Sequence, residues 1–172
     1  MTEHQGDAEF CEFAAARVTW LRRIGYLLCG DWHQADDLTQ IALTRLYRHW
    51  GRVSRMDNPD GYARTTLVNA FLAERRSPWR RVLLQAPPER ELPVADLVAI
   101  LDVREALAAL PPRQRATVVL RYYCDLSVEQ TAQALDCSVG NVKSQTSRGL
   151  DALRRALAAY ATDTAATEGL RR

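Results

Sequence analysis

The sequence predicts an all-α protein, built from two small helical domains that a flexible linker joins. Apolar residues recur at intervals of three and four along most of the chain, which is the period of helices, and strand signals are nearly absent. A proline-rich stretch without a sustained period interrupts this pattern near the middle of the chain. At 172 residues, the chain is long enough for two small domains. We therefore expect domains at residues 1–78 and 99–160, a linker at 79–98 and a disordered tail at 161–172.

The first domain is expected to contain three helices. The first spans about residues 9–28, where six apolar residues follow the helical repeat, and Gly30 is a typical C-terminal stop. The second begins within DWHQADDLTQIALTRLYRHWGRV, residues 31–53, because early acidic residues favour a helix N-terminus and a single apolar stripe follows. The turn-rich segment SRMDNPDG then precedes a third helix over about residues 62–76, which ends in two arginines.

The middle of the chain is predicted to be a tether. Its four prolines are Pro78, Pro87, Pro88 and Pro93. Residues 79–98 could reach ~65 Å when fully extended, which is enough to separate two domains widely. After it we expect helices over about residues 100–110 and 113–123, with a pair of prolines between them that breaks one helix or starts the next.

Residues 127–155 show the pattern of a helix-turn-helix. Ser127 is a good N-cap, Gln130 completes a capping box with it, and Ser138 caps a second short helix after a tight turn. The second helix has a buried stripe formed by Val142, Gly149, Leu150 and Leu153. Its other positions are small, polar or basic and suit the reading of base edges: Asn141, Lys143, Ser144, Gln145, Ser147 and Arg148. The alternative is the solvated face of an ordinary helical hairpin.

The charged residues form local clusters of one sign, although the net charge of the whole chain is small. The 23 basic and 21 acidic residues leave a net charge of +2, which excludes a polycation that binds nucleic acid along its whole surface. Residues 138–155 nevertheless carry four basic residues against Asp151 alone, whereas Asp31, Asp36 and Asp37 form an acidic group in the first domain. This division suggests a basic surface for one partner and an acidic surface for another, although either group could also be merely solvated.

Several classes of protein are disfavoured. The four cysteines contain no C-x-x-C pair, so we expect reduced thiols in a cytoplasmic protein. Cys29 and His33 are four residues apart, but two ligands alone make a weak metal site, and we expect no metal or cofactor. The N-terminus is polar and acidic, unlike a signal peptide, and no apolar run approaches the ~20 residues that a membrane span needs. No nucleophile–base pair or phosphate loop indicates an enzyme.

Two parts of the sequence resemble bacterial sigma factors of the extracytoplasmic-function group. Region 4 of that group is similar to LPPRQRATVVLRYYCDLSVEQTAQALDCSVGNVKSQTSRGLDALR, and region 2 is similar to GDWHQADDLTQIALTRLYRHW and NPDGYARTTLVNAFLAERRS. The resemblance covers about residues 9–78 and 100–158 and is greatest to the actinobacterial SigE-like branch. It implies an alternative sigma factor, which binds core RNA polymerase and directs initiation at specific promoters. Region 3 is missing, so the linker would thread the RNA exit path.

The resemblance also implies a polymerase-binding surface. In the family, the helix that contains DDLTQ docks on the clamp coiled coil of the β′ subunit, and the β subunit is a further contact. The matching residues here are Asp37, Gln40, Leu43 and Tyr47. An acidic first turn with an exposed amide beside apolar residues is also a plausible protein-binding surface in its own right. The alternative is that Asp36 and Asp37 only stabilise the helix dipole.

Promoter contacts follow from the same resemblance. Asn69 matches the asparagine that helps to recognise the melted −10 element, and Arg75 and Arg76 match a basic pair suited to phosphates. Tyr62 stands where the family often has Trp, and residues 51–60 correspond to the loop that captures a flipped base. Region 4 would read the −35 element as duplex, with Asn141 in place of the usual Thr. Members of the group can also be held by an anti-sigma factor.

Two other functions remain open from the sequence. A one-component transcription regulator would use the helix-turn-helix on a dimeric operator and would need an apolar pocket or dimer stripe in its first half. A small enzyme with a DNA-binding tail would need a catalytic site, for which the chain offers no candidate.

Overall fold

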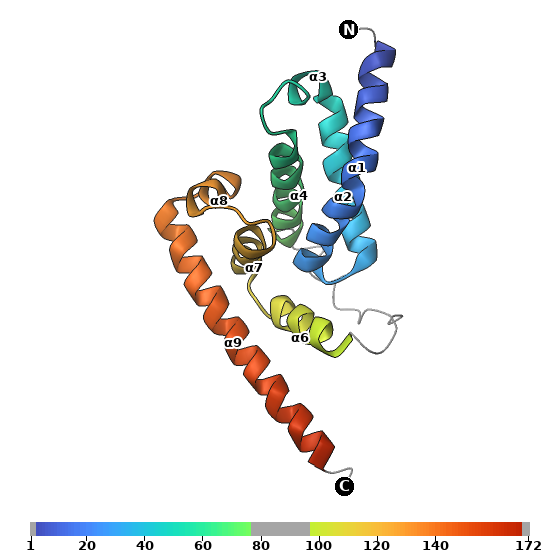
Figure 1. Cartoon of the computed structure of the whole chain (residues 1–172). Coiled ribbons are helices and arrows are strands. Elements are labelled where there is room, and N and C mark those ends of the chain that lie inside the picture. Colours follow the sequence, from blue (N-terminus) through green and yellow to red (C-terminus); the bar gives the residue numbers. More distant parts are fainter. Residues whose placement is uncertain (1–2, 77–96, 170–172) are drawn as a thin grey trace. The chain divides into compact units, whose positions relative to one another are not determined.

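A computed structural model describes residues 3–76 and 97–169, with side-chain surroundings for residues 6–76 and 103–159. The described residues form helices and contain no strand, so the predicted all-α class is confirmed. The chain divides into two units, Met1–Ala86 and Pro87–Arg172. Figure 1 shows the helices of each unit in sequence order. The predicted linker at 79–98 lies outside the described residues except for its last two positions, which begin a helix.

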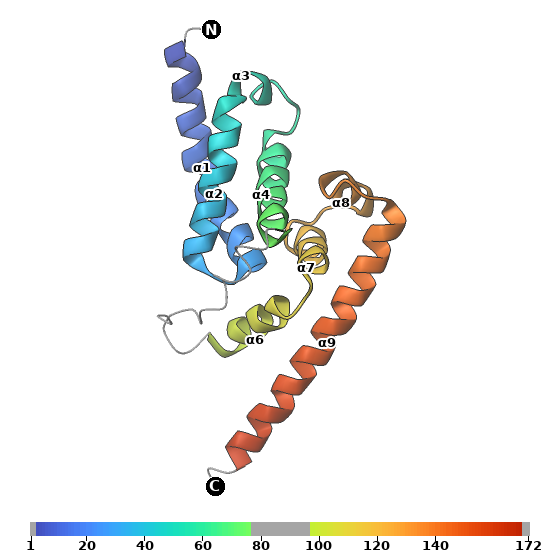
Figure 2. The ribbon, with the colours of Figure 1, turned by 180° about the vertical axis from the view of Figure 1, so that it is seen from behind.

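The first unit is a small bundle. The helices α1 (Glu3–Cys29), α2 (Trp32–Arg48) and α4 (Pro59–Arg76) pack side by side, and the short α3 (Trp50–Val53) lies at the turn between α2 and α4 (Figures 1 and 2). Its core consists of fully or almost fully buried apolar side chains from these helices, among them Leu21, Ile24, Leu28, Leu38, Leu46, Leu67 and Phe71. Burial of this apolar surface is the main stabilising contribution to the unit.

The end of α1 is set by local chemistry. Gly30 adopts φ +77°, and its N–H donates to the Tyr26 carbonyl at 2.7 Å, so the predicted glycine stop is confirmed. Asp31 then caps α2 because its carboxylate accepts a hydrogen bond from the Gln34 N–H at 2.7 Å. Helix α1 begins at Glu3, six residues before the predicted start.

The second helix ends earlier than the sequence predicts. The chain leaves helical geometry at His49, with φ −118° and ψ 12°, so residues 31–53 form α2 and α3 rather than one helix. Trp50 and Val53 are buried immediately after this break. The Trp50 ring lies 5.4 Å from the Phe10 ring and 5.0 Å from the Phe13 ring, so packing of these aromatic residues holds α3 against α1.

The second unit is arranged around one long helix. The helices α6 (Leu97–Ala108), α7 (Pro112–Val118) and α8 (Val128–Ala134) each pack against α9 (Val139–Gly169). A π-helical turn, η1 (Val119–Tyr123), follows α7 directly. The sequence predicted an α-helix through Tyr123, but the hydrogen-bonding pattern changes at Val119. One extra residue is accommodated there before the chain turns into α8.

Arg115 joins the first two helices of this unit. It is almost fully buried, and its Nη2 donates to the Ala108 carbonyl at 2.5 Å and to the Leu110 carbonyl at 3.0 Å. These are carbonyl groups at and just beyond the end of α6, which have no partner within the helix. The second arginine of LPPRQR is therefore a structural cap in this fold, and Pro112 starts α7 at its first helical position.

The helix α9 continues to Gly169, through most of the segment that the sequence predicted to be a disordered tail. Alanine recurs along residues 152–166, and alanine has the highest intrinsic helix propensity. The small, polar character that suggested a tail is compatible with a solvated helix. Composition alone therefore did not distinguish the two states.

Candidate functional site

The helix-turn-helix forms as the sequence predicts. Ser127 Oγ accepts from the Gln130 N–H at 3.1 Å, and Gln130 Oε1 accepts from the Ser127 N–H at 2.9 Å, which completes the capping box. The turn contains Asp136 at φ +48°, a left-handed conformation that Asp tolerates better than most residues. Ser138 Oγ then accepts from the Asn141 N–H at 3.1 Å and caps α9.

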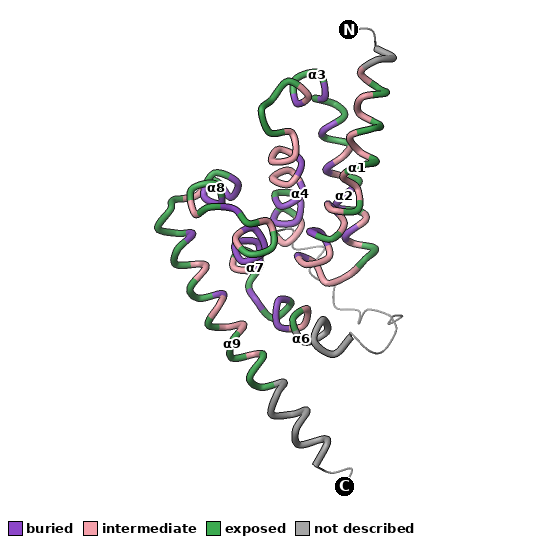
Figure 3. Tube along the Cα trace, viewed as in Figure 1, coloured by how far each residue is buried: buried purple, intermediate pink, exposed green. Residues whose placement is uncertain are grey.

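The first three turns of α9 present a polar face to solvent. Val142 is fully buried, whereas the residues predicted to read DNA are mostly exposed, and Figure 3 shows exposed positions along the start of α9. Five of the six are exposed, namely Asn141, Lys143, Ser144, Ser147 and Arg148, and Gln145 is half-buried. The structure therefore brings the five exposed residues together on a surface that a ligand could reach.

Close contact with α7 holds this helix in place. A Cβ atom at Gly149 would lie 2.8 Å from Val118 Cγ2, a separation that real Cβ atoms essentially never show. Gly149 is buried, so the missing side chain lets the two helices approach closely at this point. The orientation of the polar face depends on this contact.

An open depression beside the polar face gathers further basic residues. Arg121 of η1 lies with Lys143 and Arg154 of α9 around it, together with Ser147 and Asp151. Arg121 Nη1 donates to the Leu126 carbonyl, which holds the guanidinium at the rim. Sequence reasoning missed Arg121; its place directly before the helix-turn-helix was the available signal.

Glu129, in the first turn of α8, interacts electrostatically with two of these cations. Its pKa is lowered, first by its own backbone N–H and then by the hydrogen bond with Ser127. The positive charges of Lys143 and Arg121 lower this pKa further. The negative charge of Glu129 thus offsets part of the positive charge of Lys143 and Arg121.

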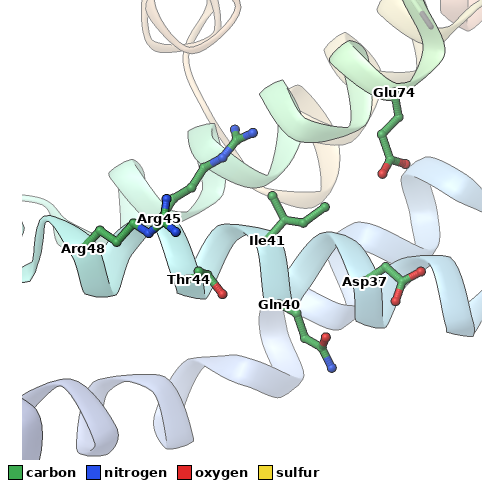
Figure 4. A pocket seen from close by; sticks show the side chains of 7 residues that line it. All are labelled: Asp37, Gln40, Ile41, Thr44, Arg45, Arg48 and Glu74. Carbon is green, nitrogen blue, oxygen red and sulfur yellow. The ribbon is translucent and has the colours of Figure 1, made fainter.

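The surface of α2 contains the residues predicted to contact polymerase. Asp37, Gln40 and Tyr47 are exposed, and Leu43 is half-buried. Figure 4 shows Asp37 and Gln40 directed away from Ile41, which points toward α4. An open depression between α2 and α4 has seven lining residues: Asp37, Gln40, Ile41, Thr44, Arg45, Arg48 and Glu74. Polar and apolar side chains are thus adjacent along one helix, as in many protein-binding surfaces.

The neighbouring aspartates of α2 differ in their surroundings. Asp36 forms an ion pair with Arg22 of α1, through Arg22 Nε to one carboxylate oxygen and through Nη2 to the other at 3.1 Å. Within the part of the chain that the structure describes, Asp37 has neither an ion pair nor a hydrogen bond through its side chain. Tyr47 is also engaged, because its hydroxyl donates to Asp7 of α1 at 2.9 Å.

The predicted −10 residues lie on α4, and three of them share a stripe. Tyr62, Asn69 and Arg76 are seven residues apart, nearly two helical turns, so they face the same direction. Asn69 and Arg76 are exposed and Tyr62 is half-buried. Arg75 lies about 100° around the helix from Arg76, and its guanidinium lies 5.5 Å from the centre of the Phe71 ring. The structure thus does not place Arg75 on this stripe.

The start of α4 is tightly defined. Asn58 Oδ1 accepts from the Gly61 N–H at 2.7 Å, which caps the helix ahead of Pro59 at its first position. Asp60 accepts from Arg17 Nε of α1 at 2.8 Å, and this partner raises the pKa of Arg17. The predicted loop at residues 51–60 is thus helical at both ends, in α3 and in the first turn of α4, and these contacts fix where it joins the stripe of α4.

The remaining predictions concern thiols, metals and membranes. Cys29 is half-buried, its Sγ donates to the Asp31 carbonyl at 3.1 Å, and burial raises its pKa to about 11. Across residues 3–76 and 97–169, no three His, Cys, Asp or Glu side chains gather as metal ligands would. No helix among those residues has the length and apolar content of a membrane span.

Comparison with known proteins identifies both halves. The chain matches the family model described as Sigma-70 region 2 over residues 14–81 and the one described as Sigma-70, region 4 over residues 100–153. It is 36% identical to the RNA polymerase sigma-E factor of Streptomyces coelicolor, over 93% of this chain and 92% of that protein. It is 32% identical to the ECF RNA polymerase sigma factor SigL of Mycobacterium tuberculosis, over 83% of this chain and 84% of that protein.

Solved structures give a related result. The sigma factor RpoE from Bartonella quintana, solved in complex with the anti-sigma factor NepR, superposes with a TM-score of 0.72. The match covers 87% of this chain and 96% of that one at 23% sequence identity. At this level of identity, the likeness bears on the fold alone.

Proposed function

Since this chain belongs to the sigma-70 family, as an extracytoplasmic-function sigma factor with regions 2 and 4, we propose that its two units divide promoter recognition between them. The first unit would bind core RNA polymerase and the melted −10 element. The second unit would read the −35 element as duplex DNA. The stretch at 79–98 would act as the linker between domains at 1–78 and 99–160.

The −35 contact is assigned to the exposed face of α9. Its side chains supply guanidinium, ammonium, amide and hydroxyl donors within the first three turns, on a helix that follows a short turn from α8. A helix of this kind fits the major groove, where each base pair presents a distinct set of donors and acceptors. Arg148 has the planar fork that suits guanine, and Lys143, nearer the helix start, suits a phosphate.

The −10 contact is assigned to the outward stripe of α4. Asn69 is exposed there and can offer its amide to the edge of an unpaired base, while Arg76 extends the stripe with a cation for phosphate. Tyr62 lies at the start of the stripe, in the first turn of α4, and the segment at 51–60 that leads into this turn would receive the flipped base. Arg75 is assigned a packing role against Phe71 rather than a DNA contact.

We assign the binding of core polymerase to the outer surface of α2. Asp37 and Gln40 would make polar contacts with the β′ clamp, and Leu43 would supply apolar contact beside them. Tyr47 would contribute its ring, since its hydroxyl already donates to Asp7. Asp36 is excluded from this role because Arg22 holds it.

Regulation and location follow from the same assignment. Sigma factors are transcription initiation factors, and we infer no catalytic chemistry in this chain and no cofactor. Bacterial transcription takes place in the cytoplasm, so we infer that the protein acts there. We also infer that an anti-sigma factor is a partner, since a sigma factor of the same fold was solved with one.

The proposal rests on one observation. The chain has two sigma regions in the expected order, and each has an exposed polar face. Run-off transcription with core polymerase across a promoter library tests it. The wild-type chain should initiate on a subset of promoters with defined −10 and −35 elements. Asn69→Ala should lower transcription about 5- to 150-fold, as the loss of ~1–3 kcal/mol at a base contact predicts. Ala73→Ser, on the same exposed stripe one turn later, should retain activity.

Binding of operator DNA by the free chain as a dimer, without stimulation of core polymerase on any promoter, would instead establish a one-component regulator. Free sigma factor should bind duplex promoter DNA poorly. When core polymerase holds both units, binding of one unit to its promoter element raises the effective concentration of the other unit at its own element. The affinity for the promoter should therefore increase in the complex.

A further inference from the structure

Two exposed aromatic residues stand near opposite ends of α2. Trp32 is the first residue of the helix and is 37% exposed, and Tyr47 lies one residue before its end and is 51% exposed. Together with Asp36, Gln40 and Leu43 they recur at every third or fourth position, so all five lie along one face of α2. This face therefore begins and ends with an aromatic ring, over a length of about 22 Å at 1.5 Å per residue.

Helix α1, which lies beside α2 in Figures 1 and 2, holds the ring at each end of this face. The Trp32 ring stacks on the Tyr26 ring, with centres 4.1 Å apart and planes inclined by 12°. At the other end, the Phe10 ring lies 5.0 Å from the Tyr47 ring, whose hydroxyl donates to Asp7. Both exposed rings are thus held in place before a partner binds, which reduces the side-chain entropy lost on binding.

Arg22 of α1 makes a second contact with the Trp32 ring. Its guanidinium carbon lies 5.3 Å from the ring centre, within the range of a cation–π contact, and the same guanidinium is paired with Asp36. The ring is therefore oriented by two side chains of α1 and is still exposed to solvent. A large apolar side chain held in this way gains free energy when a partner covers it.

We propose that Trp32, stacked on Tyr26, is an anchor residue of the surface that binds core RNA polymerase. The inference rests on the proposed function, which assigns core polymerase to the outer surface of α2. Gln40 and Leu43, assigned there, lie between Trp32 and Tyr47 on the same face, so the contact would extend about two helical turns toward the start of α2. Tryptophan and tyrosine are enriched among the residues that dominate the affinity of protein interfaces.

The composition of this face fits a single elongated partner element. Aromatic rings stand at its two ends, the amide of Gln40 and the apolar Leu43 lie between them, and the exposed Asp37 lies at its edge. An apolar centre with a charged rim is the usual composition of a protein interface. We therefore expect a helix of the polymerase to lie along α2, with an apolar residue against Trp32 and a basic residue opposite Asp37.

Local charge favours a protein over nucleic acid as the partner. An exposed aromatic ring can also stack on an unpaired base, but such sites lie in positively charged grooves. Residues 31–40 contain three aspartates and no lysine or arginine, and Arg22 is paired with one of these aspartates. A phosphate backbone would be repelled here, whereas a basic helix would be attracted.

Equilibrium binding to core polymerase measures the contribution of Trp32. The fluorescently labelled full chain is titrated with core enzyme. Trp32→Ala should weaken binding on the order of 30-fold, the loss that is typical of a dominant interface residue. Trp32→Phe keeps a smaller stacked ring and should retain part of that affinity. Tyr26→Leu leaves Trp32 in place without its stacking partner and should weaken binding less, by about 2- to 10-fold.

A matched control comes from another tryptophan of α1. Trp20 lies six residues before Tyr26, which places it about 120° around the helix, and Trp20→Phe should bind core polymerase as the wild type does. Circular dichroism and chemical denaturation establish that each variant is folded.

The solvent access of Trp32 separates a contact with polymerase from a purely structural role. Hydroxyl-radical oxidation, read by mass spectrometry, should show Trp32 and Tyr47 oxidised several-fold more slowly in the complex with core enzyme than in the free chain. Trp20 should be oxidised at the same rate in both. This measurement uses the wild-type chain, so it tests the inference even where Trp32→Ala does not fold.

The inference is overturned if Trp32 is oxidised at the same rate in the free and bound chain, or if folded Trp32→Ala binds core enzyme with unchanged affinity. Protection of Trp32 that appears without core enzyme, as the concentration of the chain rises, would also overturn it and assign the face to a second copy. Failure of the proposed function gives a different result, because the wild-type chain would then not bind core enzyme. Wild-type binding that Asp37→Arg weakens and Trp32→Ala does not would refute the anchor alone.

Discussion

Arg22 of α1 holds Asp36 of α2 through both carboxylate oxygens, which commits one of two adjacent aspartates to the contact between these helices. Asp37, the next residue, is exposed and has no such partner in the described part of the chain. Two identical side chains in sequence thus have different environments. The acidic start of α2 combines a structural ion pair with a carboxylate available to another molecule.

The first prediction separates these two aspartates. Asp37→Arg should weaken association with core polymerase on the order of 10-fold, because it reverses a charge at the proposed interface. Asp36→Asn should leave that association nearly unchanged and lower the free energy of unfolding by ~1 kcal/mol or less. Arg22 and Asp36 are each 41% exposed, and solvent screens such pairs strongly. Fluorescence titration of core enzyme and chemical denaturation measure the two effects, and equal loss of binding in both variants would contradict the assignment.

The second prediction concerns the polar face of α9. Arg148→Ala should cost ~1–3 kcal/mol and relax specificity at one position of the −35 element, since a bidentate base contact is lost. Lys143→Ala should weaken transcription more evenly across promoters, as expected of a phosphate contact. Promoters mutated singly through the −35 element, transcribed with each variant, measure both. An equal loss on every promoter with Arg148→Ala, in a folded protein, would show that Arg148 does not read a base.

The third prediction tests the contact between α7 and α9. Gly149→Ala should lower the free energy of unfolding of the second unit by ~1–3 kcal/mol, because its Cβ would lie 2.8 Å from Val118 Cγ2. Adding Val118→Ala should recover part of that loss, so the two changes should not be additive. Gly140→Ala is the control: its Cβ would meet only Ser138 Oγ at 3.9 Å, and it should be neutral or stabilise by up to ~1 kcal/mol.

The fourth prediction follows from the Cys29 thiol. Burial raises its pKa from 9.0 to about 11, so below pH 9 the thiol is protonated in both folded and unfolded states. Between pH 9 and about 11 it ionises only in the unfolded state, which favours unfolding by ~2–3 kcal/mol across that range. Denaturation at pH 8 and pH 11 should show a smaller pH-dependent loss for Cys29→Ala than for wild type. Identical losses in the two proteins would contradict the raised pKa.

Local signals in the sequence predicted the parts of the fold that depend on a few neighbouring residues. The capping box of Ser127 and Gln130, the stop at Gly30 and the buried stripe through Val142 all rest on spacings within one or two helical turns. The exposure of the polar side chains of α9 followed from the same helical period. The prediction of these features did not require knowing which helices pack against each other.

Features that depend on distant residues were not predictable in the same way. The break at His49 follows from burial of Trp50 against Phe10 and Phe13, which lie almost forty residues earlier in the chain. The separation of Asp36 from Asp37 depends on Arg22, on another helix. Arg75, which the family pattern grouped with Arg76, packs on Phe71 because one residue turns the chain by about 100°.

The continuous α9 has a practical consequence for following this protein at work. From Gly149 to Gly169 the helix extends about 30 Å at 1.5 Å per residue. A fluorophore attached at the end of α9 would stand well away from the groove-reading side chains, yet on the same rigid rod. Its rotation would report directly when the recognition helix is captured, so polarised emission could time promoter engagement without perturbing it.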